Sequence, residues 1–253
     1  MRVSLREEVV HFFGAIRFFT CLPVPARIGH GAEGLERAMR YFPVIGLIIG
    51  ALSAIFFSAL SSFWPKSLAL LASMALTALL TGGFHEDGWG DMVDGFGSAW
   101  TKEKTLEIMK DSRLGSFGVL ALTLMLAARF FIVYDLPISR IPSAMIAGPA
   151  FSRLCAVLVQ HSMTYTRLDG KARLLSVPVG WNGLVFAAMA AFLPLFLLFF
   201  RPAFLAVVFA LMAVFWLTRL FKRRIGGYTG DCLGAVQQFS EAAFYLGLSC
   251  ESS

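Results

Sequence analysis

The sequence predicts an all-α protein, a polytopic transmembrane helical bundle of about seven spans preceded by an N-terminal interfacial helix. Of its 253 residues, 57% are hydrophobic and 15% are charged, whereas soluble domains carry about 45–50% apolar and about 25% charged residues. The mean hydropathy is +0.71. The apolar residues also form runs of roughly the 20 residues that a membrane span requires. No linker or repeat divides the chain, so we expect residues 1–253 to form a single integral-membrane domain.

The first apolar run, within residues 1–20, is interrupted by charged side chains such as Glu8 and Arg17, and no small-residue cleavage site follows it. We therefore expect no cleaved signal peptide. Its apolar side chains share one helical face, which is typical of a helix in the membrane interface, and the helix should end before the prolines of "LPVP". The residues on that face are Val9, Phe12, Phe13, Ile16 and Thr20.

Seven further apolar runs follow, and each has about the length that a membrane span needs. In the first of them, Gly46 and Gly50 form a GxxxG pattern, which lets two helices approach closely. The expected spans are 43–63, 67–84, 114–134, 143–162, 181–200, 203–220 and 234–249.

Lys and Arg indicate the orientation of these spans, because cytoplasmic loops carry an excess of both. With the N-terminus inside, 17 of the 22 Lys and Arg residues fall on the cytoplasmic side, and only Lys66, Arg140 and Arg201 fall outside. We therefore expect the N-terminus and the loops 85–113 and 163–180 to be cytoplasmic. The net charge of +6 follows from this pattern, and the basic cluster at 219–224 suits contact with lipid headgroups. Because the basic residues form no single stripe, we expect no nucleic acid partner.

Acidic residues gather in "TGGFHEDGWGDMVDGFGSAW", at the cytoplasmic end of the second expected span. On a helix, Asp87, Asp91 and Asp94 would lie within roughly 60° of one another. Carboxylates so close repel each other unless a cation lies between them, and Mg2+ prefers such oxygen ligands. The segment therefore predicts a Mg2+ site, with an ordinary hydrated loop as the alternative. Glu86 would point about 100° away from Asp87, and the many glycines leave room for a ligand but favour partial unwinding.

His85 precedes these acids, and its type and position fit three roles. It could act as a general base toward a hydroxyl, donate a hydrogen bond to a phosphate, or lie at the membrane interface without a chemical role. The residues alone leave these three roles open.

Two other polar segments are expected on the same side of the membrane. Asp111 and Arg113 in "KDSRLGSFG" precede the third expected span, and Gly230 and Asp231 in "GGYTGDCLGA" precede the seventh. Glycine-rich turns that lead into helix N-termini direct backbone N–H groups toward anions, and arginine is a bidentate donor to phosphate. Both segments therefore predict phosphate binding. Alternatively, the two aspartates cap the helices that follow them.

Two arginines lie inside expected spans. Arg153, in "GPAFSRLC", is a functional-site candidate because charged residues in a membrane are costly. Its expected partner is a ligand phosphate or one of the acids, with a structural ion pair as the alternative, and Arg129 fits either role. Acids for a metal, arginines for phosphate and glycines for clearance are the composition of a phosphoryl or nucleotidyl transfer site, although residue chemistry alone does not name the substrates.

Four segments, "TGGFHEDGWGDMVDGFGS", "LEIMKDSRLGSFGVLAL", "GPAFSRL" and "GGYTGDCLGA", resemble the cobalamin synthases, the adenosylcobinamide-GDP ribazoletransferases. The departures are Glu86 and Trp89, where that family usually has leucine, and Cys232, where threonine is common. The resemblance implies a Mg2+-dependent enzyme of the bacterial cytoplasmic (inner) membrane that catalyses the last assembly step of cobalamin biosynthesis. It would join adenosylcobinamide-GDP to alpha-ribazole, or its 5'-phosphate, and release GMP.

This resemblance gives the candidate residues roles in such a reaction. Asp231 would add a metal ligand or orient the attacking hydroxyl, and His85 would assist proton transfer. The metal ligands would be Asp87, Asp91 and Asp94. The residues expected to bind phosphates are Arg113 and Arg153, with Asp111 and Gly230 beside the two helix N-termini.

Two other classes compete with this interpretation. A CDP-alcohol phosphotransferase shares Asp91, Asp94 and Gly95, but its motif then requires Ala-Arg where this chain has Ser98 and Ala99. A transporter would place its acids within the spans, whereas these lie at an expected cytoplasmic edge. The sequence does not determine the lower-ligand base, the number of metal ions, or whether the chain forms a homo-oligomer.

Overall fold

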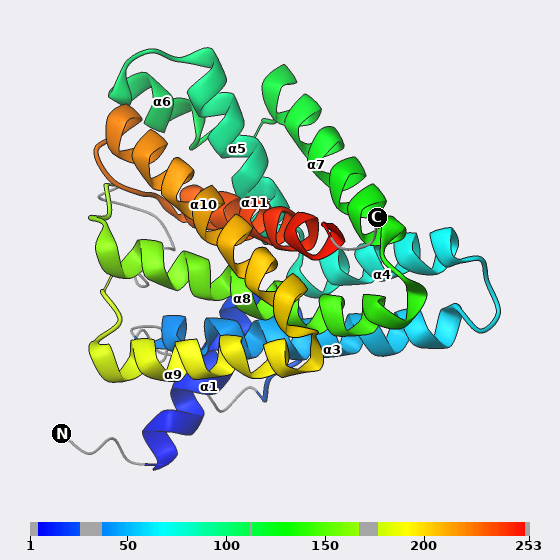
Figure 1. Ribbon diagram of the computed structural model, residues 1–253. Helices are drawn as coiled ribbons and strands as arrows, with labels where there is room; N and C mark the ends of the chain where they lie inside the picture. The colour runs from blue at the N-terminus through cyan, green and yellow to red at the C-terminus, as the bar shows by residue number, and fades with distance from the viewer. Residues whose placement is uncertain (1–4, 26–36, 112, 167–176, 251–253) are drawn as a thin grey trace.

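The computed structural model describes residues 5–25, 37–111, 113–166 and 177–250, and these ranges are mostly helical (Figure 1). Within them the only β-pairing is one isolated bridge between Tyr165 and Tyr228. The α-helices are α1 (Leu5–Phe19), α3 (Phe42–Leu60), α4 (Lys66–Thr81), α5 (Phe84–Ser98), α6 (Lys102–Ile108), α7 (Ser116–Asp135), α8 (Ile141–Ser162), α9 (Trp181–Phe192), α10 (Phe200–Arg224) and α11 (Gly230–Ser249), and the 3-10 helices are η1 (Ala38–Tyr41), η2 (Ile138–Arg140) and η4 (Leu193–Leu197).

Helix α1 is tied through Glu8 to η1, the 3-10 helix that leads into α3. The Glu8 carboxylate lies 2.5 Å from Nη2 of Arg40 and accepts a hydrogen bond from the Tyr41 hydroxyl. Burial raises the pKa of Glu8, but its bonds to Tyr41 and Arg40 outweigh burial and lower the pKa below its usual value. The expected N-terminal helix is confirmed as a helix that ends at Phe19, before "LPVP". Its position in the membrane interface stays a prediction.

Helices α3 and α8 lie side by side in the bundle because two glycines let their backbones touch. A Cβ atom added to Gly46 would lie 2.7 Å from the carbonyl carbon of Pro149, and one added to Gly50 would lie 2.9 Å from Cα of Ile146. Side chains do not pack this closely against backbone, so only glycine fits at either position. The expectation that this GxxxG pattern brings two helices together is confirmed.

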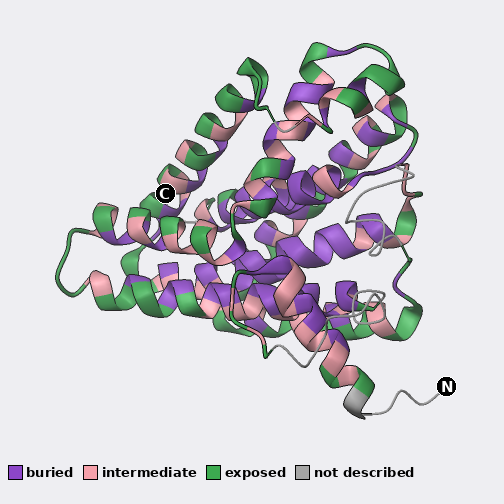
Figure 2. Cartoon of the chain, turned by 180° about the vertical axis from the view of Figure 1, so that it is seen from behind, coloured by how far each residue is buried: buried purple, intermediate pink, exposed green. Residues whose placement is uncertain are grey.

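Helix α11 crosses the middle of the bundle and is buried along most of its length (Figure 2). It packs against α10, where a Cβ on Gly247 would lie 2.5 Å from Cα of Ala206. It also packs against α5, where a Cβ on Gly88 would lie 3.0 Å from the carbonyl oxygen of Asp231 and 3.3 Å from Cα of Gly234. This crossing places the start of α11 directly against the helix that carries the acidic motif.

The chain bends sharply between α4 and α5. Gly82 and Gly83 have φ angles of 66° and 68°, in the left-handed region that favours glycine, and α5 leaves α4 at 87°. The expected partial unwinding of the acidic segment is wrong, since α5 is one continuous helix. Its glycines face neighbours instead: Gly88 meets the start of α11, and Gly95 meets the Met109 side chain after α6.

The all-α membrane bundle is confirmed, although length and composition qualify fewer than seven helices as spans. Across the described ranges, the expected span 181–200 corresponds to a shorter apolar helix, Trp181–Leu197. The expected span 234–249 lies in α11, whose polar residues are tolerated because other helices surround it. The bent pair α4–α5 counts as at most one further span. The four helices long and apolar enough to cross a membrane are Ala38–Leu60, Ser116–Asp135, Ile138–Ser162 and Phe200–Arg224.

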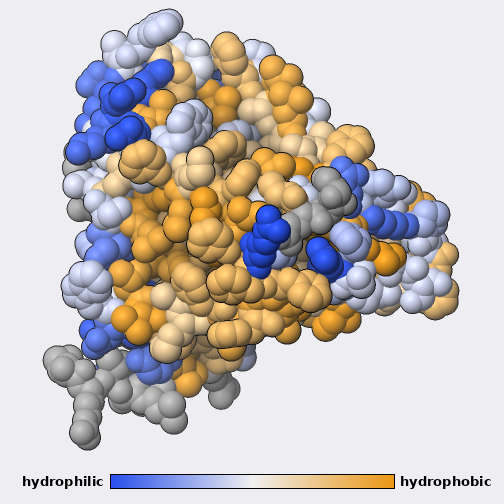
Figure 3. Space-filling model, in the orientation of Figure 1, coloured by the Kyte–Doolittle hydropathy of each residue, from blue (hydrophilic) through white to orange (hydrophobic). Residues whose placement is uncertain are grey.

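The surface is that of a protein surrounded by lipid (Figure 3). Large apolar side chains such as Phe131, Phe204 and Phe215 are exposed on the outer faces of α7 and α10, and an apolar area of this extent would be unfavourable in water. Hydrophilic groups gather where α6 lies and α10 ends, an end that includes Lys222 and Arg223 (Figures 1 and 3). The orientation of the bundle in the membrane stays a prediction.

Candidate functional site

Asp94 binds the N-terminus of α7. Asp94 is 4% exposed, and its two carboxylate oxygens accept hydrogen bonds from the backbone N–H groups of Gly115, at 2.6 Å, and Gly118, at 2.8 Å. A side chain on Gly118 would collide with this carboxylate. The glycine-rich turn before α7 does direct its N–H groups at an anion, as expected, but the anion in the structure is Asp94.

Asp87 and Asp91 lie one helical turn apart on α5, and they differ from Asp94 in being accessible. Asp87 is exposed and Asp91 is half-buried. Asp87 borders a cavity of about 590 Å³ that lies between the end of α1, the Gly82–Gly83 turn and the first turns of α7. The three aspartates share one face of α5, as expected. Because Asp94 is buried, only Asp87 and Asp91 can be reached by a ligand in solution.

Asp231 lies in the first turn of α11, which begins against α5. The N-cap of α11 is Thr229, whose hydroxyl accepts a hydrogen bond from the Cys232 N–H at 3.3 Å. The alternative role of Asp231 as the N-cap of this helix is therefore wrong. Gly230 and Asp231 form the first turn of α11, and Asp231 is half-buried next to Gly88. The structure thus packs the backbone of Asp231 against α5 at Gly88, one residue after Asp87.

Asp111 and Arg113 pair with each other on the outside of the bundle. The Arg113 guanidinium donates to both carboxylate oxygens, with a shortest distance of 2.6 Å, and the Arg113 side chain is 87% exposed. Hydrogen bonds from Arg113 lower the pKa of Asp111 to about 2. Because the N-cap of α7 is Gly115, the alternative role of Asp111 as the cap of that helix is wrong.

A buried polar network joins α7, α5 and α11 on the inner side of the acidic helix. The Arg129 guanidinium lies 2.6 Å from Oε1 of Glu241 and donates to Oε1 of Gln238 at 2.7 Å. Gln238 donates in turn to Oε1 of Glu86 at 3.0 Å. Glu86, which the sequence separated from the metal ligands, therefore holds α5 against α11.

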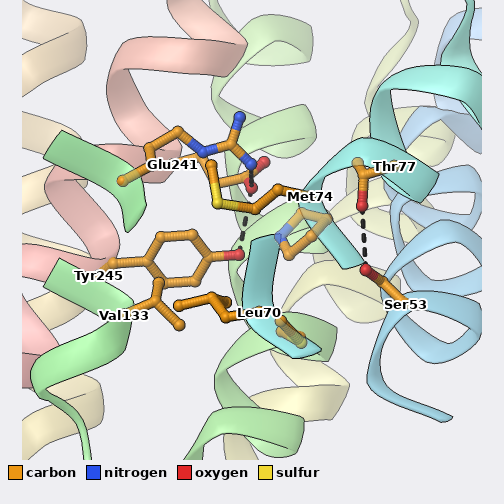
Figure 4. A pocket seen from close by; sticks show the side chains of 10 residues that line it. Ser53, Leu70, Met74, Thr77, Val133, Glu241 and Tyr245 are labelled. Atoms are coloured by element: carbon orange, nitrogen blue, oxygen red, sulfur yellow. Dashed lines mark hydrogen bonds and ion pairs between the residues drawn. The ribbon is translucent and has the colours of Figure 1, made fainter. Parts of the chain in front are cut away.

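Glu241 is the most connected member of this network. Its carboxylate accepts hydrogen bonds from Gln237 at 2.5 Å, Ser152 at 3.2 Å and the Tyr245 hydroxyl at 3.1 Å, in addition to its ion pair with Arg129. Figure 4 shows Glu241 and Tyr245 on one side of a small cavity, with bonded Ser53 and Thr77 opposite. The cavity measures about 20 Å³, room for about one water molecule.

His85 and Arg153 lie inside the bundle, away from the accessible acids. His85 is 2% exposed and Arg153 is 1% exposed. The imidazole stacks on the ring of Phe42 with centroids 5.6 Å apart, and the Arg153 guanidinium lies 5.3 Å from the same ring and donates to the Pro149 carbonyl. Two positions on a helix separate His85 from Asp87, so their side chains leave α5 on opposite sides.

The predicted site residues therefore form three groups. Asp87, Asp91 and Asp231 lie on α5 and α11, the two helices that cross at Gly88, and Asp94 holds α7 against α5. Asp111 and Arg113 form an outer pair, while His85 and Arg153 belong to the interior. Within the ranges that the structure describes, no three His, Cys, Asp or Glu side chains lie close enough to hold a metal alone.

Sequence reasoning did not single out Glu241, Gln237 or Gln238. The signal was the "QQFSE" segment inside the last expected span, where Gln237 and Glu241 are four residues apart and share a helical face. Polar and ionisable residues within an apolar run are expensive and functional by default. The same rule that selected Arg153 therefore selects the partner of Arg129.

The fold and the site define a polytopic helical membrane protein whose acidic helix carries two accessible carboxylates, one of which, Asp87, borders a cavity. The chain belongs to the CobS, or cobalamin-5-phosphate synthase, family, whose family model matches residues 11–249.

Three relatives, each named adenosylcobinamide-GDP ribazoletransferase, show how far this similarity extends. The protein of Shewanella amazonensis is 40% identical over 249 residues, which cover 96% of both chains. That of Ralstonia nicotianae is 41% identical with 95% of both chains covered, and that of Ralstonia pickettii is 40% identical with 97% covered. No solved structure matches this chain.

Proposed function

We propose that this protein catalyses the reaction for which its relatives are named. It joins adenosylcobinamide-GDP to alpha-ribazole, or to its 5'-phosphate, and releases GMP. The observation that carries this proposal is the identity of 40% over 96% of both chains with a relative of that name. Coverage of this extent includes α5, α7 and α11, the helices that form the candidate site.

Asp87 and Asp91 are the residues that would hold Mg2+, with Asp231 as a third oxygen donor from α11. Mg2+ commonly binds through one or two carboxylates together with substrate phosphates and waters, so two accessible acids one turn apart suit it without a complete protein cage. Asp94, which was expected to be a metal ligand, would instead support the start of α7, since both its oxygens already accept backbone N–H groups there. When bound, the metal ion would neutralise charge on the diphosphate of the donor.

The chemistry requires a hydroxyl of alpha-ribazole to attack the phosphate that carries the corrinoid, with GMP as the leaving group. Asp231 would orient that hydroxyl and accept its proton; the support is that its backbone packs on Gly88, within the acidic segment of α5. His85 is buried against Phe42 and would contribute by holding α5 in position. Arg113, which is exposed, is the arginine that could exchange its partner Asp111 for a phosphate, with the N–H of Gly230 as a further donor.

The protein would work in the bacterial cytoplasmic membrane with its N-terminus and acidic helix on the cytoplasmic side. The support is the excess of basic residues at the end of the bundle where α6 lies and α10 ends (Figure 3). Cytosolic nucleotide substrates would then reach the site without crossing the membrane.

The test is release of GMP from adenosylcobinamide-GDP and alpha-ribazole by purified protein in lipid. Asp87→Asn and Asp91→Asn should each lower kcat by at least about 100-fold, the scale of losing an electrostatic stabiliser, and chelation of Mg2+ should abolish turnover. Glu103→Gln, an exposed acid on α6, is the matched control and should keep normal activity. Near-normal activity of both aspartate variants would overturn the metal assignment, and substrate uptake by proteoliposomes without GMP release would favour a transporter.

A further inference from the structure

The cavity beside Asp87 is lined mainly by apolar and aromatic side chains, which the metal site of the proposed reaction does not require. Its described lining includes two aromatic rings, Phe18 and Phe84, and two leucines, Leu114 before α7 and Leu122 within it, but no Lys or Arg. A site that bound a diphosphate through protein groups would need cationic donors. The lining instead suits an uncharged, flat, apolar group.

Three segments that are distant in sequence build this cavity. Cys21 follows α1 and donates its backbone N–H to the Leu80 carbonyl of α4 at 2.7 Å, which fixes the end of α1 beside the bend. Phe18 and Phe84 meet edge to face with centroids 5.6 Å apart. At the bend, a Cβ on Gly83 would meet no atom within 4 Å, so the glycine backbone leaves open space at the cavity wall.

The geometry points to this cavity as the subsite for the aromatic base of the acceptor, a heteroaromatic nucleoside. The inference rests on the proposed function. A volume of about 590 Å³ lies in the range of small-molecule pockets and accommodates a nucleoside but not a corrin macrocycle. Asp87 at the rim would place the ribose of a bound nucleoside beside the acids of α5, where the attack on the donor takes place. Thr20, Cys21, Phe18 and Phe84 would thereby become determinants of which base is accepted.

Alkylation of Cys21 provides a direct test that does not depend on turnover. Cys21 and Cys250 are exposed, whereas Cys155 and Cys232 are buried, so a Cys250→Ser protein should react with N-ethylmaleimide at Cys21. At about ten times its Kd, alpha-ribazole should slow this alkylation about tenfold, because only the unliganded fraction reacts. GMP at the same concentration should give no protection. Equal protection by both, or by neither, would overturn the subsite.

A cavity-filling variant gives a second test. Leu122→Phe adds bulk to the wall and should raise KM for alpha-ribazole about tenfold, the effect of modest overpacking, while KM for adenosylcobinamide-GDP stays within about twofold. Leu124→Phe, which adds the same bulk at an exposed position of α7, is the control. A rise confined to the donor KM would contradict the subsite. Failure of the proposed function is a separate result, since the unmodified protein would then release no GMP.

Discussion

Arg129 and Glu241 are 112 residues apart in the sequence and form an ion pair inside the bundle, with 2.6 Å between Nη2 and Oε1. Arg129 lies within α7 and Glu241 within α11, so the pair joins two helices through the protein interior. Glu86 adds one negative charge and Arg153 one positive charge nearby, so the charges of the four side chains sum to zero. Four side chains whose charges sum to zero need no charged ligand, and we therefore assign the Arg129–Glu241 pair the structural role of holding α7 against α11.

The charge balance predicts different stabilities for single and double variants at this pair. Arg129→Met leaves two carboxylates against one guanidinium and should destabilise the protein by about 3 kcal/mol, the cost of a buried charge without its partner. Arg129→Met combined with Glu241→Leu restores the balance and should recover a large part of that loss. The measurement is unfolding by titration with a denaturing detergent.

Arg113→Met is the matched control for this experiment, because the Arg113–Asp111 pair is exposed. It should leave the unfolding curve unchanged, since exposed ion pairs contribute little. If the double variant at Arg129 and Glu241 is less stable than either single variant, the prediction that neutral pairing of the buried charges stabilises the bundle is wrong.

Asp94 is predicted to support α7 rather than to bind metal directly. Asp94→Ala removes both acceptors from the N-terminus of α7 and should cost about 1–2 kcal/mol of stability, as the loss of a helix cap does. The Mg2+ concentration for half-maximal activity should stay unchanged in this variant and should rise in Asp91→Asn, which should keep its stability. An Asp94 variant of normal stability with a raised Mg2+ requirement would reverse this assignment.

The contact of α3 with α8 should be intolerant of any side chain at Gly46. Gly46→Ala places a methyl group against the backbone of Pro149 and Ala150, so the helices must separate, and overpacking of this kind costs about 1–3 kcal/mol. Gly180→Ala is the control, since a Cβ there would meet no atom within 4 Å. Thermal unfolding in detergent should show a lower Tm for Gly46→Ala alone.

The Asp111–Arg113 pair should not contribute to any pH dependence near neutrality. The pKa of Asp111 is lowered to about 2, so the stabilisation from the pair is fully present above the ordinary carboxyl pKa of about 4 and is lost as the pH falls toward 2. Asp111→Asn should therefore change the pH–activity profile between about pH 5 and 9 only by a constant factor. A new inflection in that range would show that Asp111 titrates there.

The membrane class, the helical positions and the acidic stripe could all be predicted from the sequence because each depends on local composition or spacing. The GxxxG pattern of Gly46 and Gly50 could likewise be recognised from the sequence, without knowing which helix packs against it. The number of qualifying spans could not be predicted, because the polar residues of α11 are acceptable only inside a shell of other helices. The continuity of α5 was also missed, since partial unwinding was expected and the unbroken helix depends on neighbours that pack on Gly88 and Gly95.

The sequence by itself determined that a membrane protein carries acids on one helical face beside glycines, because periodicity and hydropathy are properties of the chain alone. Only the tertiary structure decided which acids a ligand can reach: Asp87 and Asp91 remain accessible, whereas the start of α7 covers Asp94. It also decided that Arg129 pairs with Glu241. The physical reason is that accessibility and charge pairing depend on distances between helices, and these are set by packing between residues far apart in the sequence.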